Sequence, residues 1–474
     1  MCGGYMTLSH CWGDGQHIKL RRTCSESFKN GIALEDLPRT FQDAVTTARR
    51  LKISYLWIDS LCILQDKDDL SDWFREAADM DRIYGQSYCN ISAAAADNAS
   101  VGLFMTRDPR NMRTTIDFGT GVSSEEPQKF ELLNLHLWYT HVTRAPLNCR
   151  VWVMQERFLS PRILHFAKDQ LLWECRELQA AESFPNGIPK AIGLDTMAKY
   201  KRYVEHETAA SNNADTKPIN IWMDIAHLYS ATKLTFASDK LVALSGIAKK
   251  FKQVMGDDYI AGMWQKDIET QLLWFVSGVA RFQKRPQVPT HYRAPSWAWT
   301  SITRGEVKWH YFGKKSPTAR VTNIQLDYVS EDKTGAITGG YLDLEGYLKP
   351  LYVRWDTFPP EGRPKEALVE GLKFQNGDLK FHDMDSELYE DVETLLEKVD
   401  SFYYVPVQTS SEGIEIGSTG SMLKGRGLIL QLAVPDQGLF RRVGLAEGGM
   451  QLCESLPPEY GRQFGEGWQT IRII

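Results

Sequence analysis

The chain has 474 residues, of which 43% are hydrophobic and 24% are charged. Its 20 Phe, 19 Tyr and 14 Trp supply enough apolar surface for a large core, which excludes global disorder. Lys and Arg total 55 against 60 Asp and Glu, and this balance gives no overall electrostatic footprint for nucleic acid or anionic lipid. At roughly 150 residues per domain, the length predicts about three domains or two large ones.

Several common protein classes lack their signatures in this sequence. No apolar run approaches the ~18 residues that a membrane span needs, and the first residues lack the pattern of a secretory signal. The eight cysteines have no framework spacing and no CxxC pair, which is typical of reduced thiols. The HExxH, GxSxG, P-loop and GxGxxG motifs are absent. We therefore expect a soluble cytoplasmic protein with no membrane span and no nucleic-acid partner.

Strand-like and helix-like segments alternate over residues 1–175. Strands are predicted at 5–9, 55–59 and 89–93, with a helix between each pair. Parallel strands need crossover connections, which are usually helical, so this order predicts a mainly parallel sheet covered by helices. The fold class expected for the first domain is therefore α/β.

The two crossover helices carry start signals. Thr40 and Asp43 form a variant capping box at the first helix, which has an apolar stripe at helical spacing. Ser71 is a plausible N-cap for the second helix, whose apolar positions continue to Tyr84.

The remaining chain divides by pattern. Residues 97–145 break the alternation and are predicted to be an insertion or lid. A helix at 149–156 and strands at 162–166 and 170–174 then complete the first domain. Residues 176–290 are predicted to form a helical subdomain and 291–474 a β-rich C-terminal module.

Candidate site residues follow the first two strands, because ligands of parallel sheets bind outside the carboxyl ends of the strands. These loops are polar and short; they contain His10, Cys11, Trp12, Gly13 and Asp14 after the first strand, and Asp59, Ser60, Cys62, Gln65 and Asp66 after the second. The next helix carries Glu76 three residues after Trp73, so both lie on one face. A carboxylate and an aromatic ring are thus expected to border one crevice.

Three segments in this order resemble the signature blocks of the fungal heterokaryon incompatibility (HET) domain. They are Leu8–Gly13 (LSHCWG), Trp57–Gln65 (WIDSLCILQ) and Arg150–Glu156 (RVWVMQE). Two later segments, 229–246 and 294–299, resemble stretches found downstream in such proteins, whereas Tyr5 lies so near the start that a strand upstream of it is expected to be missing. The resemblance implies a role in fungal nonself recognition and programmed cell death, with self-association or other incompatibility proteins as partners.

A second resemblance concerns TIR domains. Leu8–Asp14 is similar to their first strand and loop, and Trp73–Glu76 (WFRE) is similar to their WxxE helix. It implies a TIR-like, flavodoxin-like sheet and, since some TIR domains hydrolyse NAD+, NAD+ as a substrate rather than a bound cofactor, with no metal. Glu76 is then the catalytic candidate. The nucleotide-binding candidates implied are His10, Trp12, Gly13, Asp14, Asp59, Cys62, Gln65 and Trp73.

One carboxylate suffices for this chemistry in principle. Cleavage of the bond from nicotinamide to ribose expels a neutral leaving group, so no acid is needed, and a carboxylate stabilises the oxocarbenium-like sugar. Glu156 is a second candidate carboxylate.

Other interpretations of these residues stay open. Glu76 can instead pair with Arg75 or Arg82 on an exposed helix face. Asp59 can cap its turn, and Glu156 can pair with Arg150 or Arg157.

Two further functions compete with the NAD+ hydrolase. One is a non-catalytic TIR-like module that signals by oligomerisation. The other is a cysteine-dependent hydrolase built on Cys11 or Cys62 with His10 or His165. Neighbouring strand residues point to opposite faces, so His10 and Cys11 are poorly placed to act together, and a buried structural thiol is favoured.

Overall fold

The structure is a computed structural model that forms two compact units. It describes residues 3–13, 18–66, 68–108, 112, 114–118, 128–192, 195–206, 217–277, 292–302, 305–310, 315–355, 364–369, 372–375, 379–381, 402–410, 416–417, 420–421, 423–452 and 468–474. The first unit comprises residues 1–212, 232–234 and 242–254, and the second comprises 213–231, 235–241 and 255–474. The division into domains at 175 and 290 stays a prediction.

A six-stranded sheet forms the centre of the first unit, in the order β2-β1-β3-β6-β7-β8. The first four strands of this order are parallel, and β7 and β8 add to the edge as antiparallel strands. The predicted α/β class with a mainly parallel sheet is therefore confirmed. The strands are β1 (Tyr5–Ser9), β2 (Tyr55–Ile58), β3 (Cys89–Ser92), β6 (Arg162–Phe166), β7 (Leu171–Cys175) and β8 (Gln179–Ala181).

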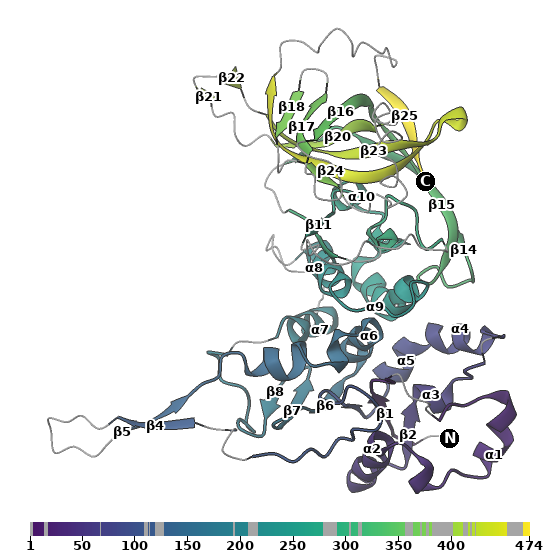
Figure 1. The fold of residues 1–474 in the computed structure, drawn as a ribbon, viewed down its shortest axis with the longest axis vertical. Helices are drawn as coiled ribbons and strands as arrows, with labels where there is room; N and C mark the ends of the chain where they lie inside the picture. Colours follow the sequence, from purple (N-terminus) through teal and green to yellow (C-terminus); the bar gives the residue numbers. More distant parts are fainter. Residues whose placement is uncertain are drawn as a thin grey trace. The chain divides into compact units, whose positions relative to one another are not determined.

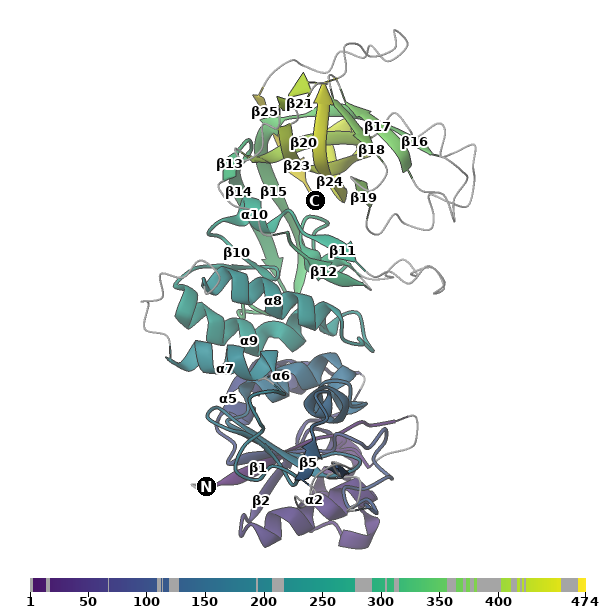
Figure 2. The ribbon, with the colours of Figure 1, turned by 90° about the vertical axis from the view of Figure 1, so that its left-hand side faces the viewer.

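One face of this sheet is apolar and carries α2 (Arg39–Arg50). Met6 and Leu8 of β1 share a buried cluster with Phe41 and Ala44 of α2. Figures 1 and 2 show α2 on one side of the strands, and Figure 1 shows α5 (Met80–Gly85) and α6 (Val151–Leu159) on the other. Because side chains alternate along a strand, β1 is held between these two helical layers.

The opposite face of the sheet is polar although it is buried. Thr7 and Ser9 of β1 lie beside Asn90 and Ser92 of β3 in the strand register, and all four are at most 2% exposed. Buried polar groups need hydrogen-bond partners. The polar side chains of this face must therefore bond to one another or to side chains of the helices that cover them.

The predicted helix starts are wrong in detail. Pro38 occupies the N-cap of α2, and no side chain caps that helix. Asp43 instead accepts a hydrogen bond from the backbone N–H of Leu103 at 2.8 Å, and Thr40 accepts one from Gly102 at 3.1 Å. Both side chains hold a loop that lies about sixty residues away in the sequence. The N–H groups of that loop are buried, so water cannot bond to them and they need an acceptor within the protein.

The helix expected from Ser71 to Tyr84 is divided into α4 (Ser71–Ala78) and α5. Asp79 separates them with φ −96° and ψ 2°, outside the α-helical region, and its N–H bonds back to Glu76 over three residues. Ser71 is the first residue of α4 and not its cap, since Leu70 takes the N-cap position.

The other elements of the first unit surround this sheet. The segment 97–145 contains an antiparallel hairpin that extends away from the sheet (Figure 1), formed by β4 (Thr114–Phe118) and β5 (Gln128–Leu132). The helices are α1 (Ser25–Lys29), α3 (Asp59–Cys62), α7 (Thr196–His206) and α9 (Asp239–Met255), of which α9 begins in the second unit.

The second unit is rich in β-strands, as predicted for the C-terminal part. Its largest sheet has eleven strands in which β20, β23 and β24 lie side by side (Figure 2). The strands of that sheet are β13 (Lys315–Pro317), β14 (Arg320–Tyr328), β15 (Ile337–Tyr347), β16 (Lys349–Trp355), β17 (Pro364–Val369), β18 (Leu372–Gln375), β19 (Leu379–Phe381), β20 (Phe402–Ser410), β23 (Leu423–Val434), β24 (Leu439–Leu452) and β25 (Trp468–Ile473). Smaller pairs and helices are β9 (Tyr259–Ile260), β10 (Met263–Trp264), β11 (Phe275–Ser277), β12 (Glu306–Lys308), β21 (Ile416–Gly417), β22 (Gly420–Ser421), α8 (Pro218–Ser230) and α10 (Ile268–Gln271).

A tryptophan cluster forms part of the core of the second unit. The indole N–H groups of Trp222 and Trp299 both donate to the carbonyl of Gly262, at 2.9 and 2.7 Å. Gly262 has φ +97°, and an added Cβ would lie 2.6 Å from Thr300 Cγ2, so the position requires glycine. Within the described part of the chain, no helix is long and apolar enough to cross a bilayer.

Candidate active site

Asp59 joins the loops that follow β1 and β2. Its carboxylate accepts a hydrogen bond from Trp12 Nε1 at 2.9 Å and lies 3.7 Å from His10 Nδ1. The same side chain accepts a hydrogen bond from the N–H of the adjacent Ser60 at 2.7 Å. Asp59 is nevertheless not the cap of α3, because Ile58 occupies the N-cap position and no side chain caps that helix.

Glu156 lies on the polar face of the sheet, in α6, and is 7% exposed. Ser9 Oγ donates a hydrogen bond to it, and Asn90 Nδ2 donates to Ser9 Oγ at 2.9 Å. Thr7 Oγ1 in turn donates to Asn90 Oδ1 at 3.0 Å. The side chains therefore form one directional chain of hydrogen bonds that ends on the Glu156 carboxylate.

The Glu156 carboxyl titrates in the neutral range. Burial raises its pKa to about 7, and the charge of Asp59 adds to that effect. The hydrogen bonds from Ser9 and Tyr84 and the charge of Arg150 act in the opposite direction. A carboxyl with this pKa exchanges its proton near physiological pH, which suits it to acid–base work.

Arg150 connects α6 to the loop after β1. Its Nη1 donates to the carbonyl oxygen of His10 at 2.5 Å, and its positive charge acts on the Cys11 thiol. The ion pairs of Glu156 with Arg150 or Arg157 do not form; Glu156 accepts a hydrogen bond from Ser9 instead.

Glu76 lies on α4 with a side chain that is 27% exposed. Its carboxylate is 3.4 Å from Arg75 Nε, which is the surface pairing considered from the sequence. Its charge also acts on the thiol of Cys62, as does the charge of Asp59. On the same helix, the Trp73 ring packs edge-to-face on Trp152 of α6, with ring centroids 5.8 Å apart.

The other predicted ligand-binding residues have local partners. Gly13 has φ +72° and is exposed, and a Cβ there would lie 2.5 Å from Asn98 Cβ. Gln65 donates from its side chain to the carbonyl of Ile63 at 3.1 Å, and its N–H bonds to Leu20. Asp14 lies outside the described residues.

The thiols near the site are poor nucleophiles in this environment. Burial raises the pKa of Cys11, and Arg150 only partly offsets this. Cys62 is exposed as a residue, yet close packing around its sulfur and the charges of Asp59 and Glu76 raise its pKa too. Because the thiolate is the reactive form, a cysteine mechanism gains no support here. His165 lies on β6 and bonds to Ser92 and Glu174.

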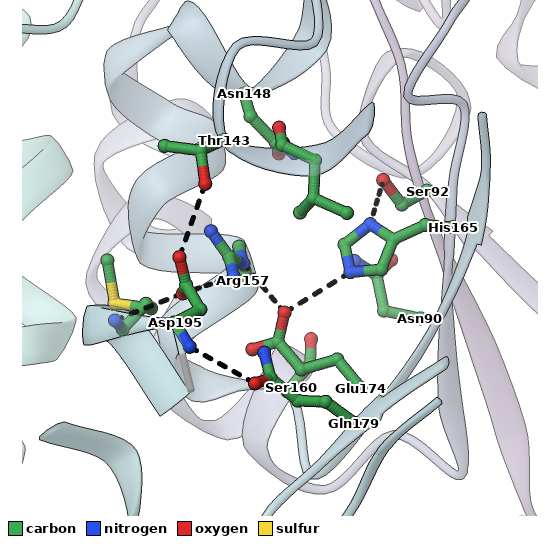
Figure 3. A network of polar contacts seen from close by, with 12 residues as sticks. Asn90, Ser92, Thr143, Asn148, Arg157, Ser160, His165, Glu174, Gln179 and Asp195 are labelled. Atoms are coloured by element: carbon green, nitrogen blue, oxygen red, sulfur yellow. Dashed lines mark hydrogen bonds and ion pairs between the residues drawn. The ribbon is translucent and has the colours of Figure 1, made fainter. Parts of the chain in front are cut away.

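A second polar cluster is centred on Glu174 (Figure 3), and its members Arg157, His165, Glu174 and Lys201 are buried. Arg157 Nε donates to Glu174 at 2.8 Å, Lys201 Nζ donates at 3.0 Å, and His165 Nε2 lies 3.2 Å away. Arg157 also donates to Asp195 at 2.6 Å. A carboxylate only accepts hydrogen bonds, so Nε2 carries the proton of a neutral imidazole and Nδ1 accepts from Ser92.

The charges of this cluster compensate one another. Burial alone would raise the pKa of Glu174, but Arg157 and Lys201 hold it well below its usual value. Burial lowers the pKa of His165 and of Lys201, and Glu174 opposes both shifts. Every charged side chain here has a partner, so the cluster links α6 and α7 to β7 as a structural network.

Sequence reasoning missed several residues of the site: Ser9, Tyr84, Asn90 and the Arg150 contact with His10. One signal was available, since β1 and β3 alternate apolar with small polar residues although both are buried. Such alternation indicates a polar buried face. No cluster of three or more metal-ligating side chains occurs among the described residues.

The part of the chain that holds these residues matches the model of one family. The model of the family described as Heterokaryon incompatibility protein (HET) matches residues 5–156, from the first residue of β1 to Glu156 in α6. The chain carries a HET domain. The three signature blocks of that HET domain supply the two strand-end loops and the Arg150–Glu156 segment. No curated protein and no solved structure matches the sequence significantly.

Proposed function

We propose that this HET domain protein acts in fungal nonself recognition and triggers programmed cell death by hydrolysing NAD+ to nicotinamide and ADP-ribose. The family match supports the incompatibility role. The observation that carries the reaction is that α4, the helix of Glu76, is tied to the loop that leaves β2, because Asp72 of α4 accepts a hydrogen bond from the N–H of Leu64 at 2.9 Å.

The strand order gives the proposal further support. In doubly wound sheets of the flavodoxin type, the order 2-1-3 creates a crevice outside the carboxyl ends of the first and third strands. The HET domain has β2-β1-β3 in this order, with Ser9 ending β1 and Ser92 ending β3. Glu156 is bonded to Ser9 at this point, and we propose a TIR-like arrangement of the site on that basis.

The two carboxyls have distinct roles in the proposed reaction. The bond between ribose C1′ and the nicotinamide nitrogen breaks, and its electron pair neutralises the pyridinium. Glu76 stabilises the positive charge that develops on the sugar. A water oxygen then bonds to C1′, and its proton passes to Glu156, whose pKa of about 7 fits a general base.

Release of nicotinamide from NAD+ by the full-length protein tests this function. Wild type should release nicotinamide, and Glu76→Gln should lower kcat by at least about a hundredfold, the usual scale for one electrostatic group. Asp79→Asn is the matched control, because Asp79 lies directly after the end of α4, pairs with Arg82 and is 47% exposed. The control should retain wild-type activity.

The alternative functions predict other results. Absence of nicotinamide release both for the dilute and for the clustered protein would contradict the hydrolase and favour a non-catalytic oligomerisation module. Activity that survives Glu76→Gln and disappears in Cys62→Ser would favour the thiol.

A further inference from the structure

Three neighbouring strands of the second unit, β14, β15 and β25, share an outer face that is rich in polar and aromatic side chains. Leu342 and Leu344 of β15 and Ile471 of β25 are at most 1% exposed, so these side chains point into the core. Because side chains alternate along a strand, the residues between them lie on the outer face. On β15 these are Tyr341, Asp343, Glu345 and Tyr347.

Two exposed aromatic rings lie at one end of this face. Tyr347 of β15 and Trp468 of β25 are direct partners in the strand register, and their ring centroids are 5.5 Å apart in an edge-to-face arrangement. They are 47% and 50% exposed. Trp468 Nε1 donates a hydrogen bond to Glu345 at 3.4 Å. The rings bury a large apolar area when a ligand covers them, so the pair forms a platform with a polar border.

An ion pair fixes the polar side chains in the middle of the face. Arg472 donates from Nε and Nη2 to the two oxygens of Asp343, at 2.7 and 2.9 Å. The same guanidinium lies 3.9 Å from the centre of the Tyr341 ring. Asn323 of β14 donates to Asp343 at 3.3 Å and to the Tyr341 hydroxyl at 3.4 Å. These groups are held in place without a ligand, which lowers the entropy cost of binding one.

The charges on this face balance. Between the register positions of Tyr341 and Tyr347 it carries two cations and two carboxylates. Arg472 is paired with Asp343, and Arg320 of β14 lies opposite Glu345 in the strand register. Binding of a phosphorylated or otherwise anionic ligand is favoured by a surplus of positive charge, which is lacking here. The balance therefore favours a neutral ligand.

The same register positions hold no aliphatic side chain. Beside the aromatic rings they carry only charged groups, amides and the hydroxyl of Thr470. The core of a protein interface is apolar and excludes water, and this face has no such centre. A sugar fits it better, because one face of a sugar ring presents C–H groups that pack on aromatic rings, and its hydroxyls both donate and accept hydrogen bonds.

We propose that the outer face of β14, β15 and β25 binds a neutral oligosaccharide. One sugar unit packs on the rings of Tyr347 and Trp468, and the hydroxyls of the units that follow bond to Asn323 and to the guanidinium of Arg472, which is 45% exposed. The strand from Tyr341 to Tyr347 is about 20 Å long, since an antiparallel strand rises about 3.4 Å per residue. The face therefore accommodates several sugar units. Hydrolysis of NAD+ is not required for this binding.

Titration calorimetry of the whole chain with neutral oligosaccharides tests the proposal. The probes are cellohexaose, laminarihexaose, maltohexaose, chitohexaose and mannohexaose. Wild type should bind at least one of them. Trp468→Ala and Tyr347→Ala should each weaken that binding by roughly tenfold, the scale of a lost aromatic anchor. Both side chains are about half exposed, so both variants should keep the circular dichroism spectrum of wild type.

Three further variants identify what the face recognises. Trp468→Phe keeps an aromatic ring and should fall between wild type and Trp468→Ala. Glu345→Gln removes a charge but keeps a hydrogen-bonding side chain, so it should retain the binding of a neutral sugar. Phe236→Ala is the matched control, because Phe236 is 66% exposed in the second unit but lies outside this sheet. The control should bind as wild type does.

The outcomes decide the proposal in either direction. Binding that is lost in Trp468→Ala and Tyr347→Ala and retained in Phe236→Ala supports it. Absence of binding to every probe, or equal affinity in wild type and both alanine variants of the ring pair, overturns it. If no probe binds and sedimentation velocity shows self-association that Trp468→Ala removes, the face is an interface between copies of the chain and not a sugar site.

Discussion

Ser9, the last residue of β1, donates a hydrogen bond to Glu156, the last residue matched by the HET family model. The contact joins residues that are 147 positions apart in sequence, and both are buried. It fixes α6 over the end of β1 and places an ionisable group inside the domain. The protonation state of Glu156 is therefore tied to the stability of the fold.

We expect the stability of the first unit to fall as the pH rises from about 4.5 to about 7. The folded state raises the pKa of Glu156 from 4.5 to about 7, so it binds this proton more tightly than the unfolded chain does. The contribution is present in full below pH 4.5 and is lost as the pH rises through about 7. Its size is on the order of 3 kcal/mol.

Chemical denaturation at several pH values measures this effect. Glu156→Gln keeps a hydrogen-bonding side chain without the ionisation, and its stability should vary less with pH over this range than that of wild type. Equal pH dependence in both proteins would contradict the assignment.

Removal of Arg157 should destabilise the first unit strongly. Arg157→Met leaves Asp195 without its guanidinium partner and deprives buried Glu174 of one of its donors. Breaking a buried pair on one side costs about 3–5 kcal/mol. Urea denaturation followed by tryptophan fluorescence gives the value, and Lys29→Met, which removes an exposed pair, should cost less than about 1 kcal/mol. Similar values for the two variants would refute the structural role of the cluster.

Asp43 should behave as a loop anchor and not as a helix cap. Asp43→Ala removes the acceptor of the Leu103 N–H, a buried group, and should cost about 1–3 kcal/mol. Gly102→Ala should also destabilise, because Gly102 has φ +89° and its added Cβ would lie 2.7 Å from Asp43 Oδ2. Hydrogen exchange distinguishes the two roles: Asp43→Ala should expose the amides near 102–104 and leave the first turn of α2 protected. Exchange confined to that first turn would restore the capping interpretation.

The reactivity of Cys62 reports the position of Glu76. Packing around the sulfur together with the charges of Asp59 and Glu76 raises the pKa of this thiol. Glu76→Gln should therefore lower that pKa and speed alkylation by iodoacetamide at neutral pH by roughly twofold. Mass spectrometry of the peptide that contains Cys62 gives the rate, with Asp79→Asn as the control. If the two variants react alike, Glu76 does not face the β2 loop.

The local sequence pattern was sufficient to predict five of the six strands of the first sheet, but neither β8 nor the order of the strands. Strand β1 was predicted at its observed bounds, Tyr5–Ser9, and β6 at Arg162–Phe166, because short apolar runs between turn signals are characteristic of buried parallel strands. The carboxyl ends of these strands then indicated where to look for a site. That reasoning brought His10, Trp12 and Asp59 together, as the structure does.

Local sequence patterns could not predict the contacts between residues that are far apart in the sequence. Thr40 and Asp43 have the spacing of a cap, and only the return of the chain at 102–103 gives their side chains better-buried partners. The break at Asp79 is marked by neither Gly nor Pro, and the apolar spacing continues across it. The partner of Glu156 was missed because Ser9 comes from the other end of the domain.

The border of the family match falls between two neighbouring residues of α6. Glu156 is bonded to Ser9 at the end of β1, whereas Arg157 is bonded to Glu174 of β7 and to Asp195 just before α7, which lie beyond the matched region. A chimera spliced between Glu156 and Arg157 would keep Ser9 with Glu156 on one side of the junction, and Arg157 with Glu174 and Asp195 on the other. Recombination between relatives is thus expected to succeed at this border, whereas a junction between Arg157 and Glu174 would separate a buried ion pair.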